Sequence, residues 1–100
     1  MILQKFQKQP REYKDYDVDY SPWLSHDAED SLDSIDAIVT CITNPEDTAL
    51  EVVRVENTMT MIKLWVQGGS HGERYKVELV VTTTVGRVDE CELIFTVKDR

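Results

Sequence analysis

Two runs of alternating apolar and polar residues near the C-terminal end constrain the fold of this chain most. Alternation with a period of two over about ten residues is typical of a half-buried β-strand. The runs meet at the short turn Gly86-Arg87, so together they predict a β-hairpin. The residues that share the inward face are Tyr75, Val77, Leu79, Val81 and Thr83 in the first run, and Cys91, Leu93, Phe95 and Val97 in the second.

A glycine-rich stretch, Gly-Gly-Ser-His-Gly at residues 68–72, precedes the hairpin and leads to Tyr75. Immunoglobulin-like sandwiches use such a corner to cross between sheets, and the tyrosine hydroxyl then hydrogen-bonds to the backbone a few residues upstream. The stretch lacks the lysine and the following helix that would make it a phosphate-binding loop. We therefore expect it to be a corner of a sandwich.

Earlier segments supply the other strands. In residues 13–24, aromatic and branched side chains alternate with carboxylates, which we expect to form a solvated face. Residues 35–42 are apolar on nearly both faces and are predicted to form a central strand, and residues 50–56 and 58–66 predict two more strands. The chain is thus predicted to be all-β, with a single immunoglobulin-like β-sandwich of about seven antiparallel strands over residues 12–100.

Residues 1–11 are predicted to be an N-terminal arm, because Ile2, Leu3 and Phe6 cannot bury themselves in so short a segment and Pro10 disfavours a helix. Three arrangements fit the pattern: a strand along the edge of the sandwich, a segment that orders against a partner, or a frayed terminus. Lys5 and Lys8 make the arm basic, whereas the rest of the chain is acidic.

The acidic balance excludes some partners. A net charge of −8 repels the phosphates of nucleic acids and of anionic lipids, so we expect no nucleic-acid partner and no membrane partner. No stretch reaches the eighteen or so apolar residues of a membrane-spanning helix, and the first residues lack the apolar run of a secretory signal. The chain is expected to fold in a reducing cytoplasm.

Neither cysteine has the setting of a nucleophile. Cys41 and Cys91 lie within apolar strand patterns, and we expect two buried free thiols in preference to a disulfide or a reactive residue. The two histidines, His26 and His71, lie in separate loops without metal-ligand spacing. The acidic loop around residues 26–33 lacks the glycine and the register of a calcium-binding loop. We predict no enzyme, no cofactor and no metal site.

Aromatic residues are the remaining candidates for binding. Trp65 is predicted on the outward face of its strand with Met61 and Lys63, and tryptophan is a frequent anchor at protein interfaces. A glycan-binding module is an alternative, with Trp65, Tyr13 and residues 68–72 as its surface. The predicted interface residues are Ile2, Leu3, Lys5, Phe6, Lys8 and Trp65.

The order of several short motifs along the chain resembles that of one family of proteins. The first half resembles that family in the stretch Tyr-Asp-Val-Asp-Tyr-Ser-Pro-Trp-Leu at residues 16–24, which is followed by an acidic loop and a strand at residues 34–40. The second half resembles it in Leu-Trp-Val-Gln-Gly-Gly at residues 64–69, Tyr-Lys-Val at residues 75–77, the threonines at residues 82–84, Gly-Arg-Val-Asp-Glu at residues 86–90 and Phe-Thr-Val-Lys at residues 95–98.

The family that these motifs resemble is that of the fibre-tail adaptors, which are small structural proteins of tailed phages. The resemblance covers residues 13–98 and implies an immunoglobulin-like virion component that takes part in assembly. The expected role is a tail or neck adaptor that docks fibres or neighbouring tail components through protein–protein contacts. The expected partners are tail, portal, neck or fibre proteins and further copies of the chain in a ring, and the expected location is the virion after assembly in the host cytoplasm. A capsid-decoration protein is the alternative closest to this role.

Overall fold

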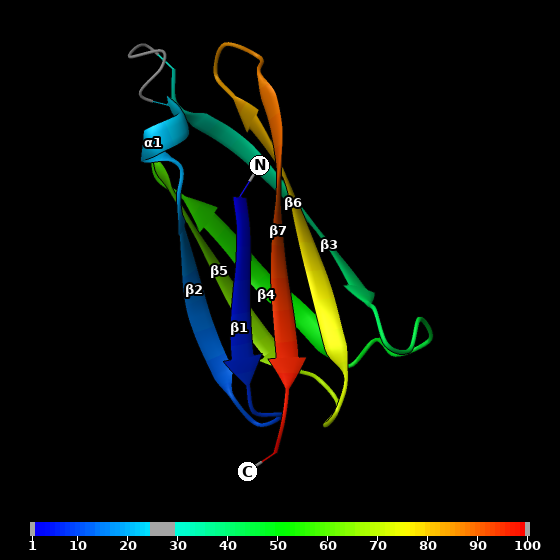
Figure 1. Ribbon diagram of the computed structural model, residues 1–100. Helices are drawn as coiled ribbons and strands as arrows, with labels where there is room; N and C mark the ends of the chain where they lie inside the picture. The colour runs from blue at the N-terminus through cyan, green and yellow to red at the C-terminus, as the bar shows by residue number, and fades with distance from the viewer. Residues whose placement is uncertain (1, 25–29, 100) are drawn as a thin grey trace.

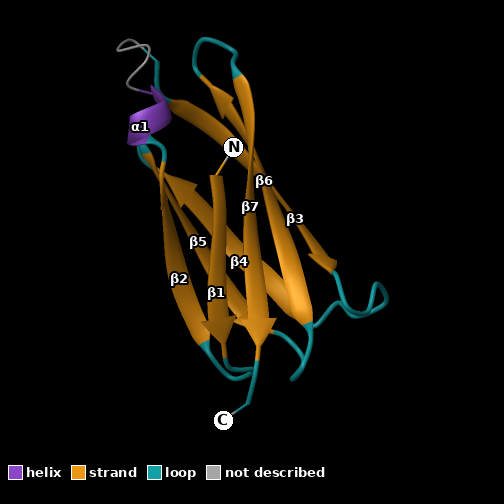
Figure 2. Ribbon diagram, viewed as in Figure 1, coloured by secondary structure: helices purple, strands orange, loops and turns teal. Residues whose placement is uncertain are grey.

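The computed structural model describes residues 2–24 and 30–99, and over these residues the chain forms strands joined by short connections (Figures 1 and 2). The strands and the one-turn helix found among the described residues are, in chain order, β1 (Ile2–Lys8), β2 (Tyr13–Asp19), α1 (Ser21–Leu24), β3 (Leu32–Cys41), β4 (Leu50–Asn57), β5 (Met61–Gly68), β6 (Arg74–Thr83) and β7 (Val88–Val97).

The strands form two sheets that pack face to face as a sandwich (Figure 1). The four-stranded sheet has the order β1-β7-β6-β3, and the three-stranded sheet has the order β2-β5-β4. All neighbouring strands are antiparallel except β1 and β7, which run parallel from the pair Ile2 and Cys91 to the pair Lys8 and Val97. The predicted all-β sandwich is confirmed, with this one parallel pair.

The alternating residues of the last two strands build the centre of the core. Those of β6 and β7 that the pattern placed inward are almost completely buried, and they face the inward residues of β2 and β5. Burial of this kind supplies most of the stabilisation of a small sandwich, at roughly 25 cal/mol for each Å² of apolar surface removed from water. The completely buried side chains from β2 and β5 include Val18, Ile62, Leu64 and Val66.

The glycine-rich corner before β6 has the predicted geometry. The backbone amide of Ser70 donates a hydrogen bond to the Tyr75 hydroxyl at 2.8 Å, and that hydroxyl donates to the Asp47 carboxylate at 2.8 Å. Gly68 starts the corner with a φ of 78°, and a Cβ atom at this position would lie 2.1 Å from the carbonyl oxygen of Ala49. Only glycine fits there, because the left-handed backbone and the close carbonyl both exclude a side chain.

The prediction that residues 35–42 form a central strand is wrong, because β3 lies at the edge of the four-stranded sheet. Its outward face carries Asp36, Ile38 and Thr40, which are all exposed, and Ile38 keeps 51% of its surface accessible. Only the alternate residues Ile35, Ala37 and Val39 pack against the core. Apolar residues on both faces of a short strand therefore do not establish that it is central.

Residues 2–8 of the predicted arm form β1, a full edge strand beside β7, which is one of the three arrangements that the sequence left open. Both cysteines are buried free thiols, as predicted. Burial raises the pKa of Cys91 to about 11, so its thiol stays protonated at neutral pH. Most of the acidic loop, from His26 to Glu29, lies outside the described residues.

Candidate interaction surfaces

The strand β1 separates the predicted interface residues into an outward and an inward set. Leu3 and Lys5 point outward and are exposed, with 57% of the Leu3 surface accessible. Phe6 and Lys8 alternate with them and point inward. Ile2 is the first residue of the strand. We use the term β1 edge for the exposed pair Leu3 and Lys5 on this strand.

Phe6 fastens β1 to the sandwich. Its ring centroid lies 4.8 Å from that of Tyr16 on β2 and 5.2 Å from that of Phe95 on β7. Tyr16 and Phe95 also meet edge to face at 4.9 Å, so the three rings join the two sheets on the side where β1 and β2 lie. Aromatic pairs at these distances stabilise a core beyond the area that they bury. Phe6 is therefore part of the sandwich in this structure.

Lys8 is the most buried base of the described residues, with 2% of its surface accessible. Its ammonium group donates to the carbonyl oxygens of Gly68 at 2.6 Å and Gln9 at 2.9 Å. Burial lowers the pKa of Lys8, although the nearby Glu12 carboxylate opposes that shift. Lys8 thus binds the first turn of the chain to the corner after β5, and it leaves no charge for a partner at that position.

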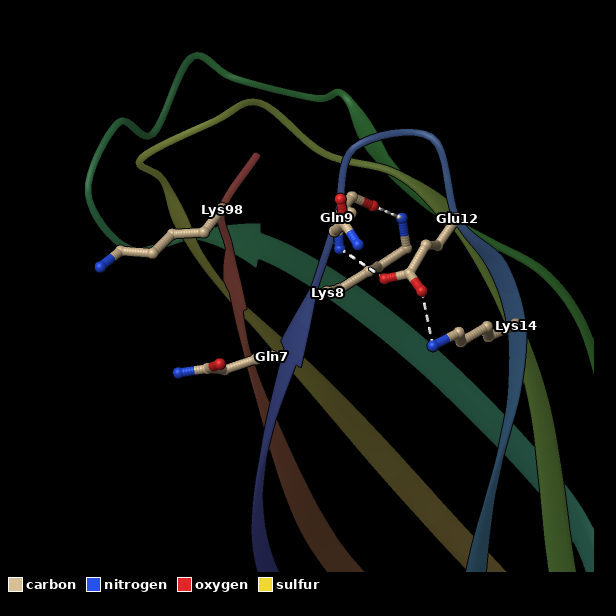
Figure 3. A pocket seen from close by; sticks show the side chains of 6 residues that line it. All are labelled: Gln7, Lys8, Gln9, Glu12, Lys14 and Lys98. Carbon is tan, nitrogen blue, oxygen red and sulfur yellow. Dashed lines mark hydrogen bonds and ion pairs between the residues drawn. The ribbon is translucent and has the colours of Figure 1, made fainter. Parts of the chain in front are cut away.

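A pocket of about 190 Å³ lies beside this turn (Figure 3). Glu12 lies on one side of the pocket. Its carboxylate accepts a hydrogen bond from the Gln9 backbone amide at 2.7 Å and pairs with the Lys14 ammonium at 2.5 Å. Figure 3 shows Lys98 extending away from this group. The lining residues are Gln7, Lys8, Gln9, Glu12, Lys14 and Lys98. Most charged groups that line the pocket are paired with other groups of the same chain. We therefore assign the pocket a structural role at this turn.

Trp65 lies in the centre of the three-stranded sheet, on the face turned away from the core. It is half-buried, since Arg54 covers the ring at 5.0 Å and the Tyr13 ring lies 5.8 Å away at an angle of 57°. The indole Nε1 atom is buried and has no hydrogen-bond partner among the described residues. Tyr13 itself is 51% exposed. We call the group Tyr13, Arg54 and Trp65 the tryptophan face.

Carboxylates border the tryptophan face. Asp15 and Asp17 flank the Lys63 ammonium at 3.2 Å and 3.8 Å, and Glu56 lies opposite Lys63 in the register of β4 and β5. The hydrogen bond from Lys63 lowers the pKa of Asp15, and the same bond raises the pKa of Lys63. The carboxylates that alternate along β2 are exposed, as the sequence predicted. This face therefore offers aromatic contact surrounded by negative charge.

A polar cluster centred on Asp30, at the end of the sandwich where the β6–β7 turn lies, was not predicted from the sequence. The Arg87 guanidinium pairs with the Asp30 carboxylate at 2.8 Å through both Nε and Nη2, and it stacks on the Trp23 ring at 4.3 Å. The backbone amides of Ser31 and Val85 donate to the same carboxylate at 2.9 Å and 3.2 Å. The cluster joins the loop before β3 to the β6–β7 turn, so we assign it a structural role.

Neither a metal-binding cluster nor a membrane-spanning helix is found among the described residues. Across residues 2–24 and 30–99, no group of three or more histidine, cysteine or acidic side chains is arranged to hold a metal ion. Within the same residues, no helix is long and apolar enough to cross a membrane. The exposed features of the described residues include the β1 edge and the tryptophan face, and also Ile38 on the outward face of β3.

Comparison with known proteins assigns the family. The model of one family, described as podophage GP4 fiber-tail adaptor protein gp77, matches residues 8–96. No curated protein matches the chain. The match spans the sandwich from the end of β1 almost to the end of β7, and it confirms the resemblance of the motifs. The family is structural and not enzymatic, and it implies a role in the tail of the virion. The chain belongs to the podophage fibre-tail adaptor family.

Proposed function

We propose that this protein is a tail adaptor that docks a fibre or a neighbouring tail component through protein–protein contacts. Family membership over residues 8–96 is the observation that carries the proposal. Several copies form a ring around the tail, and their partners are tail, portal, neck or fibre proteins. The chain folds and assembles in the host cytoplasm before it becomes part of the virion.

The structure supports the adaptor role because it offers two separate contact surfaces on one rigid body. An adaptor must contact at least two partners at once. The β1 edge belongs to the four-stranded sheet, and the tryptophan face belongs to the three-stranded sheet. Aromatic and arginine side chains are over-represented among the residues that dominate binding energy. The tryptophan face is the proposed fibre-docking surface.

The geometry favours this role over a glycan-binding module. Sugar rings stack on exposed, coplanar aromatic rings, but Tyr13 and Trp65 are inclined by 57° and Arg54 covers the indole. His71, in the adjoining loop, accepts a hydrogen bond from the Asp99 backbone amide at 2.9 Å through its Nδ1 atom. A flat sugar platform is absent from the face formed by these described residues.

Quantitative mass spectrometry of purified virions of the source phage tests the proposal. The copy number of this chain is measured relative to the portal protein in the same particles. A number comparable to that of the portal supports the tail adaptor. A number that follows the major capsid protein indicates capsid decoration, and absence of the chain from the particles excludes both roles.

A further inference from the structure

The sandwich has four strand edges that are not paired within the described chain. These edges differ in how well charges and bulges protect them from pairing with another chain. The edges are β1 and β3 in one sheet and β2 and β4 in the other. Open edges invite pairing with another chain unless charges or bulges block them. On β2 the exposed face carries a row of carboxylates, and β4 has a bulge between Val52 and Arg54 and exposed acids on either side. The edge strand β3 also has an irregularity, between Leu32 and Ser34, but this lies at the start of the strand, and the pairing from Ser34 to Cys41 is regular. The edges of β1 and β3 therefore have the longer regular stretches open to pairing.

The exposed side chains of β1 and β3 have complementary chemistry. On β1 the outward residues include an apolar residue, Leu3, and a base, Lys5. On β3 they include an acid, Asp36, and an apolar residue, Ile38, whose surface is 51% accessible. An opposite-charge pair on neighbouring strands stabilises a sheet, and it sets the register between them.

The direction of the strands also fits. Within one molecule β1 and β3 form the two opposite edges of the same sheet, and both run parallel to β7. A second copy related by a rotation that preserves strand direction can therefore place its β3 beside the β1 of the first and continue the sheet. Such a head-to-tail contact uses two different edges, so it can repeat and close into a ring.

We propose that copies of this chain join by β-strand addition, in which β1 of one copy pairs in parallel with β3 of the next, with Lys5 beside Asp36. The proposal specifies the junction of the ring and rests on the function proposed above. With this register the inward residues Phe6 and Lys8 lie opposite Ala37 and Val39, which also point inward. The side chains that point outward from the two strands therefore also lie on one common face of the continued sheet.

Symmetric pairing of like edges is less favourable. Two antiparallel β1 strands that cross near their centres bring Lys5 close to Lys5 of the second copy. Two β3 strands bring together strands that each carry Asp33 and Asp36. Like charges on adjacent strands destabilise a sheet, whereas the mixed junction pairs opposite charges. The pairing of β1 with β3 is the arrangement that removes both exposed apolar residues from open edges without bringing like charges together.

Zero-length carbodiimide cross-linking of unmodified virions tests the junction, because this reagent joins a lysine only to a carboxylate in contact. We expect a cross-linked peptide that joins Lys5 to Asp36. The two residues cannot meet within one chain, since the edges of a four-stranded sheet lie about 14 Å apart at about 4.8 Å between strands. Lys63 and Asp15, which lie 3.2 Å apart in each copy, provide the internal control. Recovery of the control peptide without the Lys5–Asp36 peptide would overturn the proposal.

Charge exchange provides a second, independent test. We expect Lys5→Asp and Asp36→Lys, each alone, to lower the copy number per virion several-fold. The double variant K5D/D36K should restore the copy number. It should also give a cross-link between positions 5 and 36, with the carboxylate now on β1 and the lysine on β3. If all three variants fold, as verified by circular dichroism, and each reaches the copy number of the unmodified chain, the junction is contradicted. Efficient disulfide formation by the single variant Ile38→Cys would instead show a symmetric β3 contact and would also overturn it.

The outcomes separate the junction from the adaptor role. If the chain is present at the copy number of the portal but the cross-link is missing, the adaptor role stands and the junction is wrong. If the chain is absent from virions, the proposed function fails. The cross-linking of the purified chain at high concentration, with isotope-labelled and unlabelled copies mixed, then decides the junction by itself.

Discussion

At the scale of single residues, Asp30 carries a buried charge that is paired within the sandwich. Its side chain is fully covered, and it accepts hydrogen bonds from the Arg87 guanidinium and from backbone amides of two loops. Burial alone would raise the pKa of Asp30, but the hydrogen bonds from Thr83, Arg87, Val85 and Ser31 outweigh it and lower the pKa to about 2. The folded chain therefore holds Asp30 ionised in acid that protonates an ordinary aspartate.

This shift predicts acid sensitivity. The pKa of Asp30 is lower in the folded state than the ordinary value of 3.8, so its contribution is complete above about pH 4 and is lost as the pH falls through about 2. We expect the urea midpoint of unfolding to fall over this interval. In Asp30→Asn the midpoint should be lower at neutral pH and less dependent on pH below 4.

The exposed Asp33→Asn is the matched control, and its profile should follow that of the unmodified chain. An unchanged pH dependence in Asp30→Asn would show that other carboxylates cause the acid sensitivity.

Tyr75 allows a second prediction at this scale. Tyr75→Phe keeps the buried ring but removes the hydroxyl that bonds to Ser70 and Asp47. We expect a loss of about 1–2 kcal/mol in the free energy of unfolding, because two polar groups lose a partner. Urea denaturation measures it, and Tyr13→Phe, at an exposed ring, should change the free energy by less than about 0.5 kcal/mol.

At the scale of elements, β1 is an integral strand because Phe6 packs between Tyr16 and Phe95. Phe6→Ala removes these ring contacts, and we expect a loss of about 2 kcal/mol in the free energy of unfolding for this half-buried position. Hydrogen exchange of the β1 amides should accelerate more than that of β6. The exposed Leu3→Ala should have little effect on either quantity. Unchanged exchange in Phe6→Ala would show that backbone pairing with β7 alone holds the strand.

The periodicity of the sequence was sufficient to predict β5, β6, β7 and the corner at Tyr75, because strands buried on one face alternate strictly and the turn residues are local. It was insufficient for β3, where Ile38 is apolar but exposed, and Ile42 directly after the strand is exposed as well. An edge position depends on which strands pair, and the pattern within one strand does not contain that information.

The candidate surfaces were predictable only in part, for the same reason. Trp65 was placed on the outward face by alternation, as the structure has it. Lys8 was assigned to an interface, but the structure turns it toward Gly68, which is 60 residues away in the sequence. Asp30 and Arg87 are 57 residues apart, and no local motif links them. Contacts between distant segments fix these roles.

At the scale of the whole molecule, the two sheets carry different exposed side chains, and we propose that they contact different partners. We expect Trp65→Ala to lower the affinity for the fibre protein at least tenfold, which corresponds to about 1.4 kcal/mol. Virions carrying this variant should keep the adaptor and lose fibres, as measured by quantitative mass spectrometry of both proteins. Met59→Ala, at a residue with 71% of its surface accessible in the β4–β5 turn, is the control. Normal fibre content in Trp65→Ala would place the docking surface elsewhere.

The parallel pair of first and last strands also determines where the chain ends leave the molecule. Ile2 lies beside Cys91, whereas the other end of β1 lies beside Val97, so the chain begins partway along the sandwich and leaves it at one end (Figure 1). A label fused to the N-terminus and one fused to the C-terminus would therefore mark two different positions along the length of the sandwich. Imaging tails that carry either label would reveal which pole of the adaptor points toward the head of the phage.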